Sequence, residues 1–178
     1  MSETKTKQSV KLRYLVLSGV LAALVFVFTA YLHIPSGNGY THAGDGVIYL
    51  AACILPTPYA IAVGVIGGAL ADGLSGFPIW IPATVLVKAV TALFFTQKSE
   101  KIVTLRNIFG IVPSLITCII GYSVYEALVI ANGVSKAGFI AAFQQIPAYC
   151  IQILVSSALF ILVGLALDKT GFKKSLLK

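Results

Sequence analysis

The stretch YLVLSGVLAALVFVFTAYL, residues 14–32, contains no charged side chain. As an α-helix it would be close to ~30 Å long, which is the thickness of the hydrocarbon core of a bilayer. Basic residues precede it, as in a secretory signal, but no convincing small-residue cleavage site follows. We therefore expect a first transmembrane helix here and not a removed peptide.

The composition extends this expectation to the whole chain. Hydrophobic residues make up 58% of the sequence and charged residues only 11%, against roughly 25% charged residues in an average soluble domain. The mean hydropathy is +0.93. These values exclude a soluble globular domain and make the lipid bilayer the expected surroundings.

The basic residues predict how the chain is oriented. The net charge is +7, but the basic side chains form short blocks and no patch interleaved with aromatic residues, so nucleic acid is not an expected partner. The blocks are Lys5, Lys7, Lys11 and Arg13; Lys98, Lys101 and Arg106; and Lys169, Lys173, Lys174 and Lys178. The positive-inside rule places both termini and the central loop in the cytoplasm, which requires an even number of spans.

Prolines divide the longest apolar run. Pro56 and Pro58 each remove an amide donor and restrict the preceding residue, so they favour two shorter helices over one kinked helix. We expect an all-α integral membrane protein, a single six-helix transmembrane domain over residues 1–178. The predicted spans are about 12–32, 45–55, 58–72, 82–96, 107–131 and 139–168, with kinks at Pro113 and Pro147 in the last two.

Four ionisable residues stand in or at the ends of the predicted spans: Asp45, Asp72, Lys88 and Glu126. An ionisable group at membrane depth is costly unless it is paired or hydrated, so each is a candidate functional residue. At 1.5 Å per residue, Lys88 lies ~10 Å and Glu126 ~8 Å from the outer ends of their helices. This common level predicts a water-accessible pocket open to the outside. The alternative is a structural pair of Lys88 with Asp72 or Glu126.

Further polar and aromatic residues recur at helical spacing. Gln145, Tyr149, Gln152 and Ser156 form one stripe that should face the bundle interior, and Ala60, Gly64 and Gly68 form a small-residue seam that ends at Asp72. Trp80 is either a stacking partner for a flat ring or part of the interfacial aromatic belt. The candidate substrate-binding residues are Asp45, Asp72, Trp80, Lys88, Tyr122, Glu126, Gln145 and Tyr149.

Catalytic and metal-binding patterns are absent from the sequence. It has no Gly-x-Ser-x-Gly, no His-Glu-x-x-His and no Walker A loop, so we expect neither an enzyme nor a nucleotide site. His33 and His42 are nine positions apart without further ligands at metal spacing. We expect no metal and no cofactor.

Four segments resemble the substrate-binding S components of energy-coupling factor (ECF) vitamin transporters. They are THAGDGVIYLAA at 41–52, LPTPYA at 55–60, GVIGGALAD at 64–72, and PIWIPAT at 78–84 before Lys88. The resemblance implies a high-affinity binder of a vitamin at the outer face of a prokaryotic plasma membrane. It also implies a transmembrane coupling subunit and two cytosolic ATPase subunits as partners. The loop between the first two helices would close over the ligand, with His33, Asn38, Tyr40 and His42 as its candidate residues.

The same resemblance implies a small-residue step in the first helix that contacts the coupling subunit. Here the matching pairs are Ser18 with Ala22, or Gly19 with Ala23. For the substrate, the residues favour a pyridine or pyrimidine such as a vitamin B6 form or hydroxymethylpyrimidine; riboflavin, thiamine, niacin and queuosine precursors stay open.

Three other function classes remain open at this stage. One is a stand-alone ion-coupled carrier or channel for small solutes, although the inner halves of the predicted helices carry no evident charged path. Another is a membrane-embedded enzyme using Asp45 and His42 as an acid–base pair. The last is an accessory or assembly protein that binds no small molecule.

Overall fold

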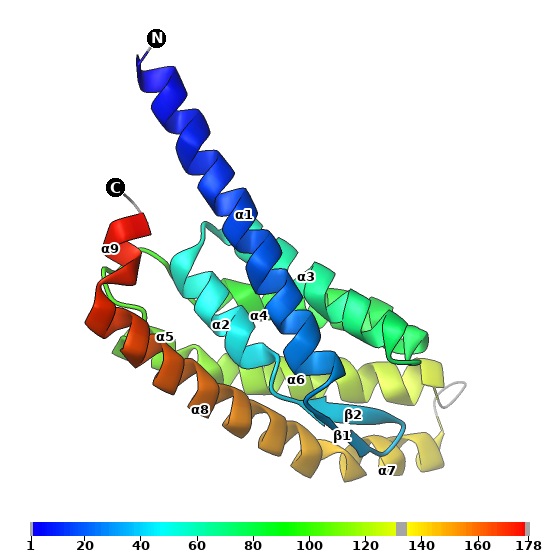
Figure 1. Cartoon of the computed structure of the whole chain (residues 1–178). Coiled ribbons are helices and arrows are strands. Elements are labelled where there is room, and N and C mark those ends of the chain that lie inside the picture. Colours follow the sequence, from blue (N-terminus) through cyan, green and yellow to red (C-terminus); the bar gives the residue numbers. More distant parts are fainter. Residues whose placement is uncertain (1, 131–134, 177–178) are drawn as a thin grey trace.

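The computed structural model describes residues 2–130 and 135–176, most of them helical (Figure 1). Four apolar helical segments are long enough to cross a bilayer: Val10–Ala30, Thr57–Leu74, Leu105–Ile130 and Lys136–Thr170. Asp45–Ile54 and Pro78–Leu93 are apolar but shorter. The elements are α1 (Ser2–Ala30), β1 (His33–Ser36), β2 (Gly39–His42), α2 (Asp45–Ile54), α3 (Thr57–Leu74), η1 (Pro78–Trp80), α4 (Ile81–Leu93), α5 (Leu105–Phe109), α6 (Ile111–Tyr125), η2 (Glu126–Ile130), α7 (Lys136–Gln144), α8 (Ile146–Thr170) and α9 (Phe172–Leu176).

Proline residues set several helix starts. α2 ends at Ile54, and α3 begins at Thr57 with Pro58 in its first turn, where the missing amide hydrogen costs no intrahelical bond. The segment expected as one helix over 139–168 starts at Lys136 and is divided at Gln145, because Pro147 opens α8 in the same way.

The segment expected as one helix over 107–131 is also divided. α5 leads into α6 at Gly110, where an added Cβ would lie 2.6 Å from the Phe94 carbonyl oxygen. α6 then widens into the π-helical turn η2 at Glu126. Residue 131, with which this predicted span ends, lies outside the described residues.

The loop between α1 and α2 is a β-hairpin, which is a correction to the all-α expectation. β1 and β2 pair antiparallel, with His33 opposite His42 and Ser36 opposite Gly39. Gly37 turns the chain with a φ of +54°, a conformation that glycine adopts without steric cost. The hairpin lies across the end of the bundle at which α1 stops and α2 starts (Figure 1).

Helix α2 is the centre of the fold. All its residues are buried, and it contacts α1, α3, α4 and α8. Helix α3 packs closely between α1 and α4 by means of glycines. A Cβ at Gly67 would lie 2.6 Å from Val25 Cβ of α1, and a Cβ at Gly68 would lie 2.8 Å from Thr84 Cγ2 of α4. Gly68, a member of the predicted small-residue seam, therefore lies in close contact with α4.

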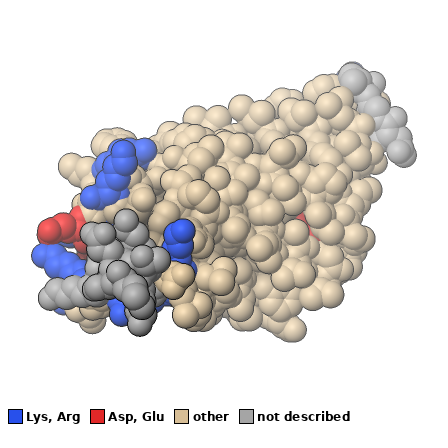
Figure 2. Space-filling model, turned by 90° about the horizontal axis from the view of Figure 1, so that it is seen from above, with Lys and Arg blue, Asp and Glu red and all other residues tan. Residues whose placement is uncertain are grey.

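The distribution of apolar and charged side chains is the reverse of that in a soluble protein. Large apolar side chains point outward along the helices, among them Leu86, Leu154 and Leu162, while charged residues such as Asp45 and Lys88 are buried. On the face shown in Figure 2, the lysines and arginines gather at one end of the molecule and the remaining surface is almost entirely uncharged. We call this the basic end, and the opposite end the hairpin end.

The close approach of α1 and α3 gives a test of this packing. We expect Gly67→Ala to lower the stability of the purified protein by about 1–3 kcal/mol, because its Cβ would overlap the backbone and side chains of α1. Gly73→Ala in the same helix is the control, since its Cβ would meet only Ile81 Cδ1 at 3.5 Å. Thermal unfolding in detergent measures both, and equal midpoints would contradict the packing described.

Candidate functional site

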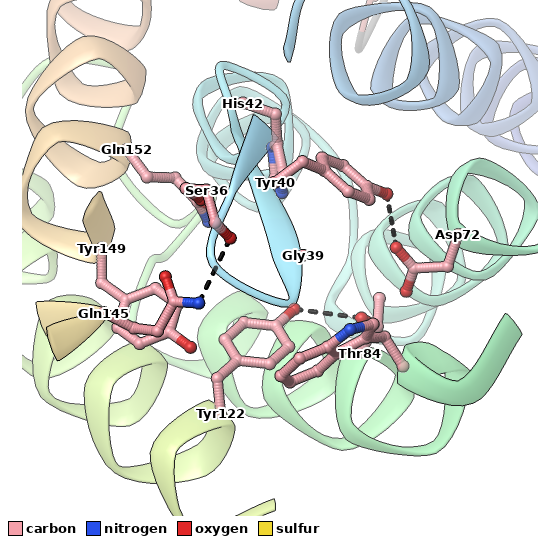
Figure 3. Close-up of a pocket in the computed structure, with 11 residues that line it drawn as sticks. Ser36, Gly39, Tyr40, His42, Asp72, Thr84, Tyr122, Gln145, Tyr149 and Gln152 are labelled. Carbon is pink, nitrogen blue, oxygen red and sulfur yellow. Dashed lines mark hydrogen bonds between the residues drawn. The ribbon is translucent and has the colours of Figure 1, made fainter. Parts of the chain in front are cut away.

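A small cavity of about 40 Å³ lies between the hairpin and the helices (Figure 3). Hairpin residues form one wall, and side chains from α3, η1, α4, α6 and α8 form the others. Its lining consists of Ser36, Gly39, Tyr40, His42, Asp72, Trp80, Thr84, Tyr122, Gln145, Tyr149 and Gln152. Polar and aromatic groups thus meet at the hairpin end of an otherwise apolar bundle.

The tip of the hairpin is held by two hydrogen bonds. Trp80 Nε1 donates to the carbonyl oxygen of Asn38 at 3.0 Å. The side chain of Asn38 in turn donates to Glu126 Oε1, also at 3.0 Å. Glu126 is the first residue of the π-helical turn, and its side chain is buried beneath the hairpin.

The two strands of the hairpin are held as well. Gln145 Nε2 donates to the carbonyl oxygen of Ser36 at 3.2 Å, and the Tyr40 hydroxyl donates to Asp72 Oδ1 (Figure 3). Burial and the nearby carboxylate raise the pKa of Tyr40, so the phenol keeps its proton and acts as a donor. The hairpin is therefore attached to α3 through a carboxylate acceptor and to the α7–α8 junction through a hydrogen bond between neutral groups.

An ion pair lies beneath the cavity. Lys88 Nζ is 2.6 Å from Asp45 Oδ1, and each side chain is only 2% exposed. The alternative interpretation, a structural pair of Lys88 with Asp72 or Glu126, is therefore wrong in its partner, which is Asp45. Asp45 opens α2, the helix around which the others pack, whereas Asp72 and Glu126 are already bonded to the hairpin.

The ion pair fixes the orientation of Gln152. Its Nε2 donates to Asp45 Oδ2 at 2.8 Å and approaches Cys118 Sγ at 3.8 Å. A carboxylate bound to lysine only accepts hydrogen bonds, so the amide nitrogen must face it. Gln152 keeps its carbonyl oxygen as an acceptor and, near Cys118 Sγ, a second amide hydrogen as a donor.

Aromatic rings form the remaining walls. Tyr122 and Tyr149 stack with their centroids 5.8 Å apart at an interplanar angle of 23°, and Trp80 meets Tyr122 edge-on at 5.9 Å. Lys88 Nζ lies 5.4 Å from the centroid of Tyr122, and the Tyr122 hydroxyl shares a hydrogen bond of 3.1 Å with Thr84. These rings offer flat apolar faces with polar edges, which suits a flat heterocycle.

His42 closes the hairpin onto α2. Its Nδ1 accepts a hydrogen bond from the Gly44 amide at 3.1 Å, which requires an unprotonated Nδ1. Burial, aided by the charge of Lys88, lowers the pKa of His42 to about 3. The imidazole is therefore neutral at physiological pH.

A protein-family model described as "ECF-type riboflavin transporter, S component" matches residues 9–169. The chain belongs to this family of ECF transporter S components. A search of curated proteins finds no significant match. With its four long apolar helices, the chain is a multi-pass membrane protein of a transporter family whose members bind small vitamins and work with a transmembrane component and ATPases.

The S component's predicted substrate-binding residues fall into two groups. Asp72, Trp80, Tyr122, Gln145 and Tyr149 line the cavity. The other three lie around it: Asp45 and Lys88 beneath it, and Glu126 against the hairpin.

The four predicted lid residues all lie in the hairpin. Tyr40 and His42 line the cavity, Asn38 bonds Glu126, and the His33 ring contacts Tyr40 with centroids 4.8 Å apart.

Sequence reasoning left out four of the residues that line the cavity. Gln152 belongs to the polar stripe on α8 and could have been included on that ground. Thr84 lies one turn before Lys88 on α4, which is also a readable signal. Ser36 and Gly39 reach the cavity only because the loop folds as a hairpin, which was not predicted from the sequence.

The two small-residue pairs of α1 lie on different faces. Ser18 and Ala22 are each 8% exposed and face the interior of the S component, so a partner protein could not reach them. Gly19 and Ala23 are exposed, and a Cβ at Gly19 would meet nothing within 4 Å. Of the two predicted coupling contacts, only Gly19 with Ala23 is on the surface.

The neutral His42 predicts a pH dependence of folding. An unfolded chain takes up a proton on this histidine near its ordinary pKa of 6.5, whereas the folded S component does so only near 3. Stability should therefore fall as pH drops from about 6.5 toward 3, by up to about 1.4 kcal/mol per unit. Thermal unfolding of wild type and His42→Gln across this range measures the difference, which we expect to be a shallower slope in the variant. His33→Gln in the paired strand is the control, and identical slopes in all three proteins would refute the assignment.

Proposed function

We propose that this S component binds a flat heterocyclic vitamin or vitamin precursor between the hairpin and the helices, with the hairpin as its lid. The observation that carries the proposal is the cavity lined by both hairpin and helix residues, with aromatic faces and polar edges. A transmembrane coupling subunit and two cytosolic ATPase subunits would then drive release on the other side.

The proposed topology has six membrane-embedded helices in one domain over residues 1–178. Four are the long segments; α2 and the η1–α4 segment are short and complete the bundle. The basic end carries the Lys- and Arg-rich segments, which supports cytoplasmic termini and an outward hairpin in a prokaryotic plasma membrane.

The polar groups favour a ligand with hydrogen-bond donors. Asp72 Oδ2 is buried without a partner among the described residues, and the carbonyl oxygen of Gln152, a residue of the cavity lining, is a further acceptor. Both accept hydrogen bonds, so the ring should carry hydroxyl or amino substituents or a protonated ring nitrogen. A pyridine or pyrimidine such as a vitamin B6 form or hydroxymethylpyrimidine meets this requirement.

The size of the cavity supports a small ring. A volume of about 40 Å³ holds no more than a few water molecules, so even a single ring requires the hairpin to move outward. The hydrogen bonds between neutral groups that hold the hairpin each contribute about 1 kcal/mol, and those to the Asp72 and Glu126 carboxylates about 1.5–3 kcal/mol. Water can replace each of them when the hairpin moves outward. Riboflavin is the second candidate, favoured by the description of the matching family, and it would require a larger displacement.

Purification in mild detergent tests the proposal directly. We expect mass spectrometry of the released small molecules to find a nitrogen heterocycle in stoichiometric amount, and the ligand found decides between the single-ring candidates and riboflavin. Tyr149→Ala should weaken its binding about tenfold through loss of a stacking face. Tyr59→Ala, whose ring contacts Tyr14 near the basic end, should leave affinity unchanged within about twofold.

An S component that is folded but binds none of these compounds would contradict the proposed function. Uptake into vesicles that contain this chain alone would instead support a stand-alone carrier.

The exposed Gly19–Ala23 pair on α1 allows a separate test of the contact with the coupling subunit. We expect Gly19→Leu to leave folding and ligand affinity intact, because its side chain would point away from the rest of the chain. It should block close approach of a partner helix and so prevent co-purification with the coupling subunit. Ala158→Leu, a similar enlargement on the exposed face of α8, is the control. Unimpaired co-purification of Gly19→Leu would place the contact elsewhere.

A further inference from the structure

A second cavity, of about 300 Å³, lies at the basic end, remote from the hairpin. It is formed by the end of α8, the start of α9 and the segment that follows α4. Four lysines line it, Lys101, Lys169, Lys173 and Lys174, together with the acidic Glu100 and Asp168. Nothing in the proposed vitamin site uses this cavity.

The acidic residues of this cavity are already engaged. Asp168 accepts hydrogen bonds from the amides of Ile102 at 2.7 Å and Val103 at 3.0 Å, so it holds the loop after α4. Glu100 pairs with Lys174 at 3.0 Å. Asp168 keeps its negative charge in these bonds, so the four lysines and two carboxylates leave a net charge of +2 in the cavity lining.

Lys173 is the most unusual of these lysines. Its residue is only 4% exposed, and among the described residues its ammonium has one hydrogen-bond acceptor, the carbonyl oxygen of Ser99. Burial lowers the pKa of Lys173, which reflects the cost of holding its charge there. An anion in the cavity would accept the remaining N–H hydrogens and repay that cost.

The surroundings point to a lipid as the source of that anion. Leu162 and Leu165 of α8 are exposed apolar residues one to two turns before Lys169. A molecule with its anionic group among the lysines could continue along this apolar surface with its acyl chains. A free phosphate would use the lysines but gain nothing from the apolar surface.

We propose that the cavity at the basic end binds the phosphate headgroup of an anionic lipid. The headgroup phosphate accepts hydrogen bonds from Lys173 and from the exposed Lys101 and Lys169, and the acyl chains lie against α8. Binding joins α8, α9 and the loop after α4 into one anchored unit at the membrane surface. The inference does not depend on which vitamin the hairpin encloses.

Native mass spectrometry of the full chain in neutral detergent tests this assignment. We expect wild type to retain phosphatidylglycerol and not phosphatidylcholine. The double variant Lys101→Gln/Lys169→Gln should bind phosphatidylglycerol about 25-fold more weakly, at about fivefold for each lysine. Both lysines are exposed, so folding should be unaffected, and thermal unfolding checks this. Lys136→Gln, which removes one exposed charge at the hairpin end, is the control for net charge.

Four results would overturn the proposal. Equal retention of both lipids, or equal losses in the double variant and in Lys136→Gln, would mean that no specific headgroup site exists. Inorganic phosphate that binds wild type as tightly as the lipid, with the same dependence on the two lysines, would make a free anion the ligand. Binding of a polyglutamate peptide in place of phosphatidylglycerol would make the cavity a protein contact.

Discussion

A lysine and an aspartate that are each 2% exposed in a membrane-embedded bundle are stable only together. Removing one partner of such a pair leaves a buried charge, at a cost of roughly 3–5 kcal/mol. Asp45 begins α2 and Lys88 lies on α4, and Gln152 of α8 donates to the same carboxylate. The pair therefore fixes the relative positions of three helices and forms a rigid floor for the cavity.

The roof of the cavity is built differently from its floor. Separate side chains, from α3, η1, the π-helical turn and the α7–α8 junction, each contribute one hydrogen bond to the hairpin. Each bond contributes about 1–3 kcal/mol by itself, and water can replace it when the hairpin moves outward. In the proposed function, a ligand would enter at the hairpin end by displacing these separate hydrogen bonds, while the ion pair keeps the packing around α2 intact.

The sequence was sufficient for the features that rest on local chemistry. Uncharged runs indicate helices in lipid, Pro56 and Pro58 mark a break, and five of the eight predicted substrate-binding residues line the cavity. It was not sufficient for choices that depend on long-range geometry. Several carboxylates were at a suitable depth for Lys88, and only the central position of α2 selects Asp45. The hairpin was missed because its turn, Gly37-Asn38, lies between strands of only four residues with little β-pattern.

The two small-residue pairs of α1 are the clearest case of a choice that the sequence alone could not make. Ser18–Ala22 and Gly19–Ala23 are offset by one residue, so they point about 100° apart around the helix while looking alike in sequence. Helix α3 decides between them, because Gly67 lets it approach the face of α1 that carries Ala22 and Val25. That contact buries the Ser18–Ala22 pair within the bundle and leaves the Gly19–Ala23 pair on the surface. A glycine on a neighbouring helix thus determines which face of α1 is available to a partner.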